Sequence, residues 1–367
     1  MTRTLALDTL PPVTAEEVSR VLKSSPAKTS TMDIIPTSLV IRCTTVFSEI
    51  IAHLANLSFS EGRFPTVFKQ ATVTPLIKGH SLDKSVPSNY RPISNLNFIS
   101  KILERLFLSR FQSHILNSPN FNKYQSAYRP GCSTETAVQL LLDRIYSAGD
   151  AGRPTLLISL DMSAAFDTID HSVLLRRLSC SFGIVGNVHS WIQSYLTGRT
   201  QSVRIGSHSA PPDPAFVGVP QGSVLGPLLF SIYTSPISTI ADYHHVSQQQ
   251  YADDTQLYLA LSPTDYSPGI TVLESCLNSL HLWFSENGMA LNPTKSAVVL
   301  FGTPQRLQSL SGLHSFNAAG TDIKLSGKVK ILGATLDSNL TMEPHTKALS
   351  SSCHIRSFRQ IRPSILR

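Results

Sequence analysis

The stretch 251-YADDTQLYLA-260 places two adjacent aspartates at the start of a run in which polar and apolar residues alternate. Such alternation predicts a β-strand with one buried face. Neighbouring carboxylates repel each other, and Asp favours turns because it tolerates left-handed backbone. The sequence therefore predicts a hairpin whose tip carries Asp253 and Asp254, and the turn alone is one sufficient explanation of the pair.

A second strand ends directly on a carboxylate. The run 155-TLLISL-160 is apolar throughout, which is typical of a strand buried on both faces, and Asp161 follows it. A charge at a sheet edge is costly to desolvate unless something compensates it. One explanation of Asp161 is a helix N-cap, and another is a divalent metal ion, since Asp oxygens suit Mg²⁺. If the two strands are neighbours, Asp161, Asp253 and Asp254 converge as a two-metal site for nucleotidyl transfer requires.

Helices and strands follow one another along the chain without a repeated order. Thr14-x-x-Glu17 reads as a capping box that opens a short helix. Further helices are predicted over 37–60, 98–117, 171–182, 189–196, 225–237 and 270–285. Strands are predicted over 71–77, 155–160, 201–205, 296–301 and 329–336. The helix over 37–60 is expected to bury Leu39, Val40, Phe47, Ile50, Ile51, Leu54 and Leu57. Because no βαβ unit repeats, the predicted fold class is α+β.

The composition restricts the class of protein. The 367 residues include 31 Lys+Arg and 24 Asp+Glu, and the net charge of +7 suits a polyanionic partner such as nucleic acid. The five cysteines are far apart and form no C-x-x-C, which supports neither a disulfide framework nor a zinc site. The start lacks a signal peptide's apolar core, and no apolar run approaches the roughly 18 residues of a membrane span. We expect an intracellular protein that is not secreted and does not enter a membrane.

Several of these segments resemble the motifs of one enzyme family. Tyr251-Ala252-Asp253-Asp254 resembles the Y-x-D-D box of reverse transcriptases. The stretch 160-LDMSAAFDTIDH-171 resembles their first catalytic motif in the form found in non-LTR (LINE-type) retrotransposons. Four more segments are similar to family motifs and occur in the family's order: 89-NYRPISNLNFISKILERL-106, 218-GVPQGSVLGPLLF-230, 288-GMALNPTKSAVVLFG-302 and the primer grip 329-VKILGATLD-337. Five or six boxes in order, over about residues 65 to 340, are highly specific.

The resemblance implies a right-hand polymerase whose palm is an antiparallel sheet packed on helices. It implies an N-terminal helical extension over 1–64, fingers over 65–154, a palm over 155–302, and a primer grip with a partial thumb over 303–367. The end of the chain has a basic, helical pattern that would suit a thumb element against a nucleic-acid backbone, with Arg356, Arg359, Arg362 and Arg367.

The implied activity is RNA-directed DNA polymerisation. A DNA primer would be extended on an RNA template from deoxynucleoside triphosphates, with two Mg²⁺ ions (or Mn²⁺ in their place) and release of pyrophosphate. The implied location is the nucleus and cytoplasm, and the oligomeric state is left open. No endonuclease can be assigned, because the chain begins shortly before the fingers strand and contains no C-x-x-C. The alternative is a truncated relic that binds nucleic acid without catalysing.

The resemblance also assigns roles to residues near the acids. Asp161, Asp253 and Asp254 would be the catalytic acids and metal ligands, and the backbone carbonyl of Met162 would add a ligand. Phe166 would be the steric gate, with its ring in the space of a ribose 2′-hydroxyl. A place in the core would explain Phe166 equally well, and both roles can hold at once.

Asp167, next to Phe166, would favour the opposite sugar preference. RNA-dependent RNA polymerases use a second acid at about the position of Asp167 to accept the ribose 2′-hydroxyl. Phe166 at the gate position and the Tyr-Ala-Asp-Asp box favour DNA synthesis instead.

The remaining implied contacts are with the nucleotide. Gln221 and Gly222 would lie near the incoming nucleotide and the template, where Gly permits close backbone approach. Arg91 and Lys78 would contact the triphosphate, although a solvated surface role is the alternative for both. Lys295 would protonate pyrophosphate.

The stretch 244-HHVSQQQ-250 is more polar than a strand leading into Asp253 ought to be. It is predicted to be a solvated loop. A metal site at His244 and His245 is the alternative.

Overall fold

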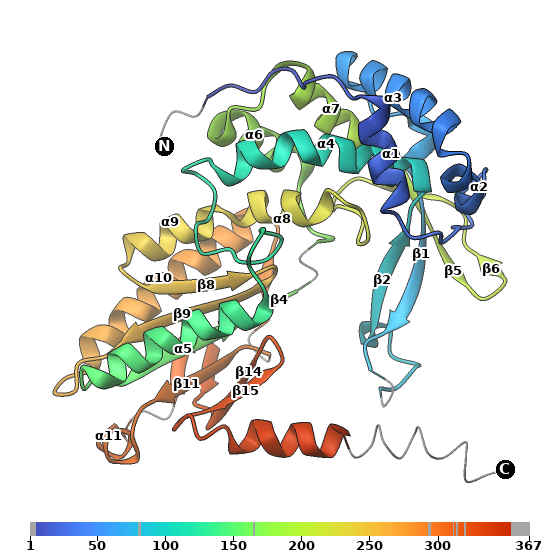
Figure 1. Ribbon diagram of the computed structural model, residues 1–367. Helices are drawn as coiled ribbons and strands as arrows, with labels where there is room; N and C mark the ends of the chain where they lie inside the picture. Colours follow the sequence, from blue (N-terminus) through green and yellow to red (C-terminus); the bar gives the residue numbers. More distant parts are fainter. Residues whose placement is uncertain are drawn as a thin grey trace, which may run out of the picture. The chain divides into compact units, whose positions relative to one another are not determined.

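The computed structural model describes residues 5–79, 82–163, 166–292, 295–310, 312, 315–318 and 321–353. The chain forms two compact units (Figure 1). The first unit is Met1–Asn122 with Ala164–Pro236, and the second is Lys123–Ser163 with Ile237–Arg367. The fold class is α+β, as predicted. The boundaries of extension, fingers, palm and thumb stay predictions, and the four C-terminal arginines from Arg356 to Arg367 lie outside the described residues. No described helix has the length and apolarity needed to cross a bilayer.

The first unit packs helices around a small sheet. Its helices are α1 (Ala15–Lys23), α2 (Thr37–Arg42), α3 (Thr44–Ser60), α4 (Phe98–Leu116), α6 (His171–Phe182), α7 (Gly186–Leu196) and α8 (Gly226–Thr234), with 3-10 turns η1 (Thr66–Phe68) and η2 (Pro87–Asn89). Its strands are β1 (Gln70–Ile77), β2 (Tyr90–Asn95), β5 (Arg199–Ile205), β6 (His208–Ser209) and β7 (Asp213–Ala215). β1 pairs antiparallel with β2 and parallel with β5.

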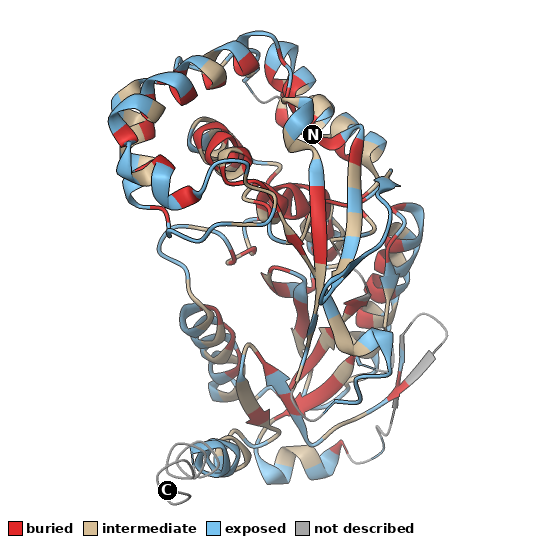
Figure 2. Cartoon of the chain, turned by 90° about the vertical axis from the view of Figure 1, so that its right-hand side faces the viewer, coloured by how far each residue is buried: buried red, intermediate tan, exposed pale blue. Residues whose placement is uncertain are grey.

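An aromatic cluster forms the core between the helices of this unit. Trp191 stacks on Phe107 with ring centroids 3.9 Å apart, and it meets Phe59 and Phe64 edge-on. All four rings are buried, and aromatic pairs of this kind add to the stability that burial alone provides. Figure 2 shows helices whose buried residues lie on one side and whose exposed residues lie on the other, as in α1, where Val18 and Leu22 are buried, whereas α8 is buried along nearly its whole length.

The predicted helix over 37–60 is two helices, α2 and α3, which meet at Cys43. The predicted apolar face was wrong in part, since Leu39, Ile50 and Leu57 are exposed. The side of α3 that is buried carries mainly small residues: Thr44, Ser48, Ile51, Ala52, Ala55, Ser58 and Phe59. Small side chains let helices approach closely, and α1 packs on α3. The helical periodicity was predicted correctly, but packing against α1 sets which side of α3 is buried.

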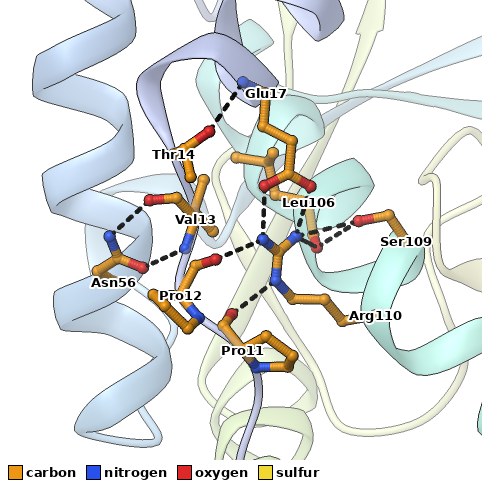
Figure 3. A network of polar contacts seen from close by, with 9 residues as sticks. All are labelled: Pro11, Pro12, Val13, Thr14, Glu17, Asn56, Leu106, Ser109 and Arg110. Atoms are coloured by element: carbon orange, nitrogen blue, oxygen red, sulfur yellow. Dashed lines mark hydrogen bonds and ion pairs between the residues drawn. The ribbon is translucent and has the colours of Figure 1, made fainter.

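Helix α1 begins as its capping pattern predicts. The hydroxyl of Thr14 accepts a hydrogen bond of 3.3 Å from the backbone N–H of Glu17. The preceding residue, Val13, is joined to the Asn56 side chain of α3 by two reciprocal hydrogen bonds of 2.7 and 2.9 Å (Figure 3). The N-terminal segment is thus fixed to α3 at the point where α1 starts.

Arg110 of α4 fixes the same segment from the other side (Figure 3). Its guanidinium donates to both carboxylate oxygens of Glu17, at 3.0 and 2.6 Å, in the bidentate geometry that makes such pairs strong. It also donates to the carbonyls of Pro11 and Pro12 at 2.7 and 2.8 Å. Only 8% of the Arg110 side chain is exposed. This one residue therefore bonds the N-terminal segment to α4 at three positions, Pro11, Pro12 and Glu17.

We expect Arg110→Ala to lower the free energy of unfolding by about 2 to 4 kcal/mol, because it leaves a half-buried carboxylate and two carbonyls without their donor. Urea unfolding followed by tryptophan fluorescence measures this, since Trp191 is fully buried in the same unit. Lys23→Ala, at an exposed position of α1, is the matched control. Equal midpoints for the two variants would contradict the anchoring role.

The same pair gives a pH dependence. The hydrogen bonds from Arg110 hold the pKa of Glu17 below its ordinary value. A carboxyl with a lowered pKa stabilises the fold above its unfolded pKa of about 4.3 and loses that contribution as the pH falls through the folded-state value. The stability difference between the unaltered chain and Arg110→Ala is therefore expected to shrink on acidification below that pH. A difference that stays constant into strong acid would contradict the ion pair.

The second unit is built on a four-stranded sheet of order β11-β3-β9-β8, antiparallel throughout. Its strands are β3 (Thr155–Leu160), β8 (Ser247–Tyr251), β9 (Asp254–Ala260) and β11 (Ala297–Phe301). Short pairs add β4 (Met162–Ser163) with β10 (Ala290–Leu291), β12 (Ser315–Ala318) with β13 (Thr321–Lys324), and β14 (Lys328–Ile331) with β15 (Ala334–Asp337). The helices are α5 (Thr134–Asp150), α9 (Pro236–Tyr243), α10 (Ser267–Glu286) and α11 (Pro304–Ser309), and 343–353 is also helical.

Strand β3 is buried on both faces, as its apolar run predicts. Leu157 packs in one cluster with Leu141 and Ile145 of α5, while Leu156 and Ile158 point to the opposite face of the sheet and are equally buried. Helix α5 thus covers one face of the sheet (Figure 1). This is the antiparallel sheet packed on helices that was predicted for the palm.

Two predictions in this unit, one of a strand and one of a loop, were wrong. The segment over 329–336 is a hairpin, because Leu332 and Gly333 both have positive φ, 48° and 93°, as a tight two-residue turn requires. The stretch over 244–250 is not a solvated loop beyond residue 246. Gln248, Gln249 and Gln250 lie in β8 and are at most 2% exposed.

The His pair before β8 has an ordinary structural explanation. His244 lies within hydrogen-bond distance of the Ser279 hydroxyl, with Nε2 and Oγ 2.9 Å apart. In the part of the chain that the structure describes, neither His244 nor His245 joins a group of three or more potential metal ligands.

Candidate active site

The acidic pair lies at a hairpin tip, as predicted. Tyr251 and Asp254 face each other in the β8–β9 register, so Ala252 and Asp253 form the two-residue turn and Asp254 is the first residue of β9. Ala252 has a φ of 56°, in the left-handed region. Tyr128 lies close enough for the charge of Asp253 to add to burial in raising the pKa of the Tyr128 hydroxyl.

Asp161 lies at the same edge of the same sheet. Leu160, the last residue of β3, is paired with Thr255, so Asp161 follows β3 beside the start of β9. Burial of its carboxyl and the negative charges of Asp253 and Asp161 raise the pKa of Asp254 to about 6. The structure therefore brings the three acids together. The helix N-cap explanation of Asp161 was wrong, because the short strand β4 follows it.

The backbone around Asp161 is fixed by the segment before β11. The N–H of Asn292 donates to the Asp161 carbonyl at 2.9 Å, and the Asp161 N–H donates to the Ser296 hydroxyl at 3.3 Å. Lys295, in the same segment, places Nζ 3.8 Å from Oδ2 of Asp161. The Lys295 side chain is 63% exposed, so this ion pair contributes little to stability. The ion pair does, however, place the Lys295 ammonium beside Asp161.

The donor chemistry of the three acids fits a divalent cation. Carboxylate oxygens are the ligands that Mg²⁺ prefers. The pKa of Asp254 is raised by burial and then by the charges of Asp253 and Asp161, and a bound cation would offset the repulsion among these charges. Met162, which follows Asp161, pairs with Leu291 across the short β4–β10 ladder. In the described residues, no three His, Cys, Asp or Glu side chains are already gathered in the geometry of a metal site.

The predicted gate residue belongs to the first unit. Phe166 is half-buried and stacks on Phe230 of α8, with ring centroids 4.8 Å apart and an interplanar angle of 22°. A core contact is therefore part of its role, and its gate function stays a prediction. Next to it, Oδ2 of Asp167 accepts a hydrogen bond of 2.9 Å from the Gln221 amide. Asp167 and Gln221 line one cavity of about 420 Å³.

Glycine at position 222 is required by a neighbouring strand. The N–H of Ser94 in β2 donates to the Gln221 carbonyl at 2.7 Å, which brings the two backbones together. Gly222 has a φ of 120°, and a Cβ there would meet the Ser94 carbonyl oxygen at 2.7 Å. The close backbone approach predicted for Gly222 is thus made to β2, whereas its approach to a nucleotide stays a prediction.

A buried carboxylate that the sequence analysis missed holds the other end of this loop. Glu104 of α4 is fully buried and accepts hydrogen bonds from the N–H groups of Val224 and Leu225, at 2.8 and 3.1 Å, just before α8. The Tyr195 hydroxyl donates to it at 3.2 Å. Burial raises the pKa of Glu104, and these donors together with the charge of Arg199 oppose that shift. The sequence offered only one indication of this role, which is that Glu104 is a single acidic residue between Leu103 and Leu106 on an apolar helix face.

The two predicted triphosphate contacts are exposed residues of the first unit. Lys78 directly follows β1, and its Nζ donates to the Ser88 carbonyl at 2.8 Å. Arg91 lies in β2 opposite Leu76. Exposure leaves both side chains accessible to an anion, and their role in binding triphosphate stays a prediction.

Comparison with known proteins identifies the family. The sequence pattern of the family described as "Reverse transcriptase (RNA-dependent DNA polymerase)" matches residues 78–336. The "Probable RNA-directed DNA polymerase from transposon BS" of Drosophila melanogaster is 29% identical over 360 residues, which are 94% of this chain and 38% of that protein. The "RNA-directed DNA polymerase from mobile element jockey" of the same organism is 29% identical over 339 residues, 91% of this chain and 36% of that protein.

The chain thus spans between a third and two-fifths of the length of these relatives. Among solved structures, an apo telomerase from Candida tropicalis truncated from its C-terminal domain is similar at a TM-score of 0.49 and 14% identity, over 75% of this chain and 54% of that one. The family match covers most of the chain and includes every acid of the sheet edge. The chain belongs to the reverse transcriptase (RNA-dependent DNA polymerase) family, and within it to the LINE-type group that its motifs resemble.

Proposed function

We propose that this chain is an RNA-directed DNA polymerase of a retroelement. It extends the 3′-hydroxyl of a DNA primer on an RNA template, uses deoxynucleoside triphosphates and releases pyrophosphate. The observation that supports this proposal most directly is the meeting of Asp161, Asp253 and Asp254 at one sheet edge, in a chain of the reverse transcriptase family.

The three carboxylates would hold the metal, with the Met162 carbonyl as a further ligand. Two bound Mg²⁺ ions, or Mn²⁺ in their place, would supply Lewis-acid activation of the 3′-hydroxyl and charge neutralisation of the triphosphate. Asp253 lies in the hairpin turn and Asp254 is the first residue of β9, so the β8–β9 ladder places the backbone of both residues at the sheet edge.

The other predicted residues contact the incoming nucleotide or the leaving pyrophosphate. Lys78 and Arg91 bind the triphosphate as exposed cations. Lys295, whose ammonium lies 3.8 Å from Asp161, protonates the leaving pyrophosphate. Gln221 and Gly222 form the loop beside the incoming nucleotide, and this loop is held in one conformation by its bonds to Ser94 and Asp167.

The partners follow from the reaction and from the charge. An RNA template and a DNA primer are polyanions, and the net charge of +7 favours their binding in a salt-dependent way. We place the protein inside the cell, in the nucleus and cytoplasm, because its five scattered cysteines suit a reducing compartment. The alternative, a relic that binds nucleic acid without catalysing, would bind primer and template but would not extend the primer.

Primer extension distinguishes the two functions. The chain is mixed with a labelled DNA primer annealed to RNA, Mg²⁺ and one deoxynucleotide at a time, with binding measured in parallel at two salt concentrations. We expect addition of only the nucleotide that the template base specifies. Binding that weakens with salt, without any extension, would favour the relic.

A further inference from the structure

A short segment before α5 runs along the free edge of β8. The N–H of Gln250 donates to the Tyr124 carbonyl at 3.1 Å, and the N–H of Ser126 donates to the Gln250 carbonyl at 2.8 Å. These bonds pair the segment in parallel with the last residues of β8. Gln125, between the two paired positions, is thereby placed beside the turn that carries Asp253.

The Gln125 side chain is bonded to both polar groups of one turn residue. Its Oε1 accepts from the N–H of Ala252 at 2.9 Å, and its Nε2 donates to the Ala252 carbonyl at 3.1 Å. Oε1 also accepts from the N–H of Ala127 at 3.0 Å. Gln125 is 1% exposed, so water does not compete for these bonds. One amide therefore fixes the turn residue and is itself fixed by its own segment.

The turn needs such a partner because of its backbone. Ala252 has a φ of 56°, a conformation that a residue with a Cβ adopts only at a cost. Glycine would adopt it freely, and the sequence has alanine. In this left-handed conformation both the N–H and the carbonyl of Ala252 are bonded to Gln125, and these bonds offset that cost. They also fix the direction in which the next two residues, Asp253 and Asp254, leave the turn.

We propose that Gln125 is the positioning residue of the catalytic turn. It holds the left-handed backbone at Ala252 and so determines where the carboxylates of Asp253 and Asp254 lie relative to Asp161. Its effect on catalysis rests on the polymerase function proposed above. Glutamine suits this task because one planar amide supplies a donor and an acceptor together, whereas glutamate lacks the donor and methionine lacks both.

The test compares Gln125→Met with Gln249→Met. Both glutamines are buried in the same unit, but the Gln249 amide donates to the Ser126 hydroxyl, at 3.1 Å, instead of to the turn residue Ala252. We expect Gln125→Met to lower kcat for primer extension on the order of 100-fold, because small displacements of catalytic groups have effects of this size. Affinity for primer and template should not change. The control should stay close to the unaltered chain.

Hydrogen exchange provides a readout that does not depend on catalysis. The Ala252 amide is bonded to Gln125, so its exchange should become at least about tenfold faster in Gln125→Met and stay slow in Gln249→Met. Gln125→Glu, which keeps the acceptor for this amide and loses the donor, should exchange at an intermediate rate and serves if the methionine variant does not fold. Exchange at Ala252 that is the same in the Gln125 variants and the control would overturn the proposal.

The two readouts also separate this proposal from the function on which it rests. If the unaltered chain extends no primer but Gln125→Met still accelerates exchange at Ala252, the positioning of the turn stands and the polymerase activity fails. If extension is normal in Gln125→Met, the positioning role is wrong whatever happens to the polymerase proposal.

Discussion

Asp253→Asn is expected to lower the rate of primer extension about 1,000-fold or more, because removing a metal-binding carboxylate forfeits roughly 4 kcal/mol of transition-state stabilisation. Asparagine has the same shape and Asp253 is exposed at the hairpin tip, so the fold should be unchanged. The variant should therefore bind primer and template and unfold at the same urea concentration as the unaltered chain.

Asp242→Asn is the matched control for this variant. Asp242 belongs to the same unit, and its carboxylate pairs with Lys123 at 3.3 Å on the surface, where such pairs contribute little. It should extend primers normally. A rate for Asp253→Asn within tenfold of that for Asp242→Asn would remove Asp253 from the catalytic site.

Phe166→Ala is expected to admit ribonucleotides. The ring would fill the space of a 2′-hydroxyl, and an apolar pocket that excludes one hydroxyl discriminates on the order of 100-fold. The ratio of kcat/KM for a deoxynucleotide to that for the matching ribonucleotide should fall by about this factor. Because Phe166 also stacks on Phe230, the variant should lose stability. A ratio measured within one variant is independent of how much protein is folded.

Phe216→Ala is the control for this substitution, since Phe216 is 80% exposed in the same unit. Its sugar selectivity should match that of the unaltered chain. If Phe166→Ala keeps the same selectivity as well, Phe166 is a core residue only, and the sugar preference must be set by another group.

The acidic edge could be predicted because its signals are local. An apolar run ending at Asp161 and an alternating run beginning at Asp254 are each read from fewer than ten residues, and antiparallel pairing of the two strands brings their acids to one edge. The helices predicted over 98–117 and 171–182 are present as α4 and α6 for the same reason. Each of them has its own apolar spacing and its own N-cap, from Asn97 and Asp170.

Burial that depends on distant segments could not be predicted. The three glutamines of β8 look like a loop, but the strand is paired with β9 on one side, and on the other side Gln250 is bonded to the backbone of residues 124 and 126. Helix α5 was missed altogether, although Ser133 and Thr136 form a reciprocal capping box at its start. Its pattern of Ala137, Leu141 and Ile145 is a narrow stripe among exposed residues.

The residues that hold the site in shape were also missed. Gln125 and Glu104 bind backbone groups more than a hundred residues away in sequence, at separations of 127 and 120. No local pattern encodes such a contact. Their common signal is a polar side chain in apolar surroundings, and it becomes informative only once the structure shows which backbone groups it satisfies.

Iron-directed cleavage tests most directly whether Asp161, Asp253 and Asp254 hold one metal site. Fe²⁺ that replaces Mg²⁺ generates hydroxyl radicals in the presence of ascorbate and peroxide, and these cut the backbone close to the bound ion. We predict cuts near residue 161 and near residues 253–254, both suppressed by excess Mg²⁺. Cuts elsewhere, or cuts that Mg²⁺ does not suppress, would contradict a shared site at this sheet edge.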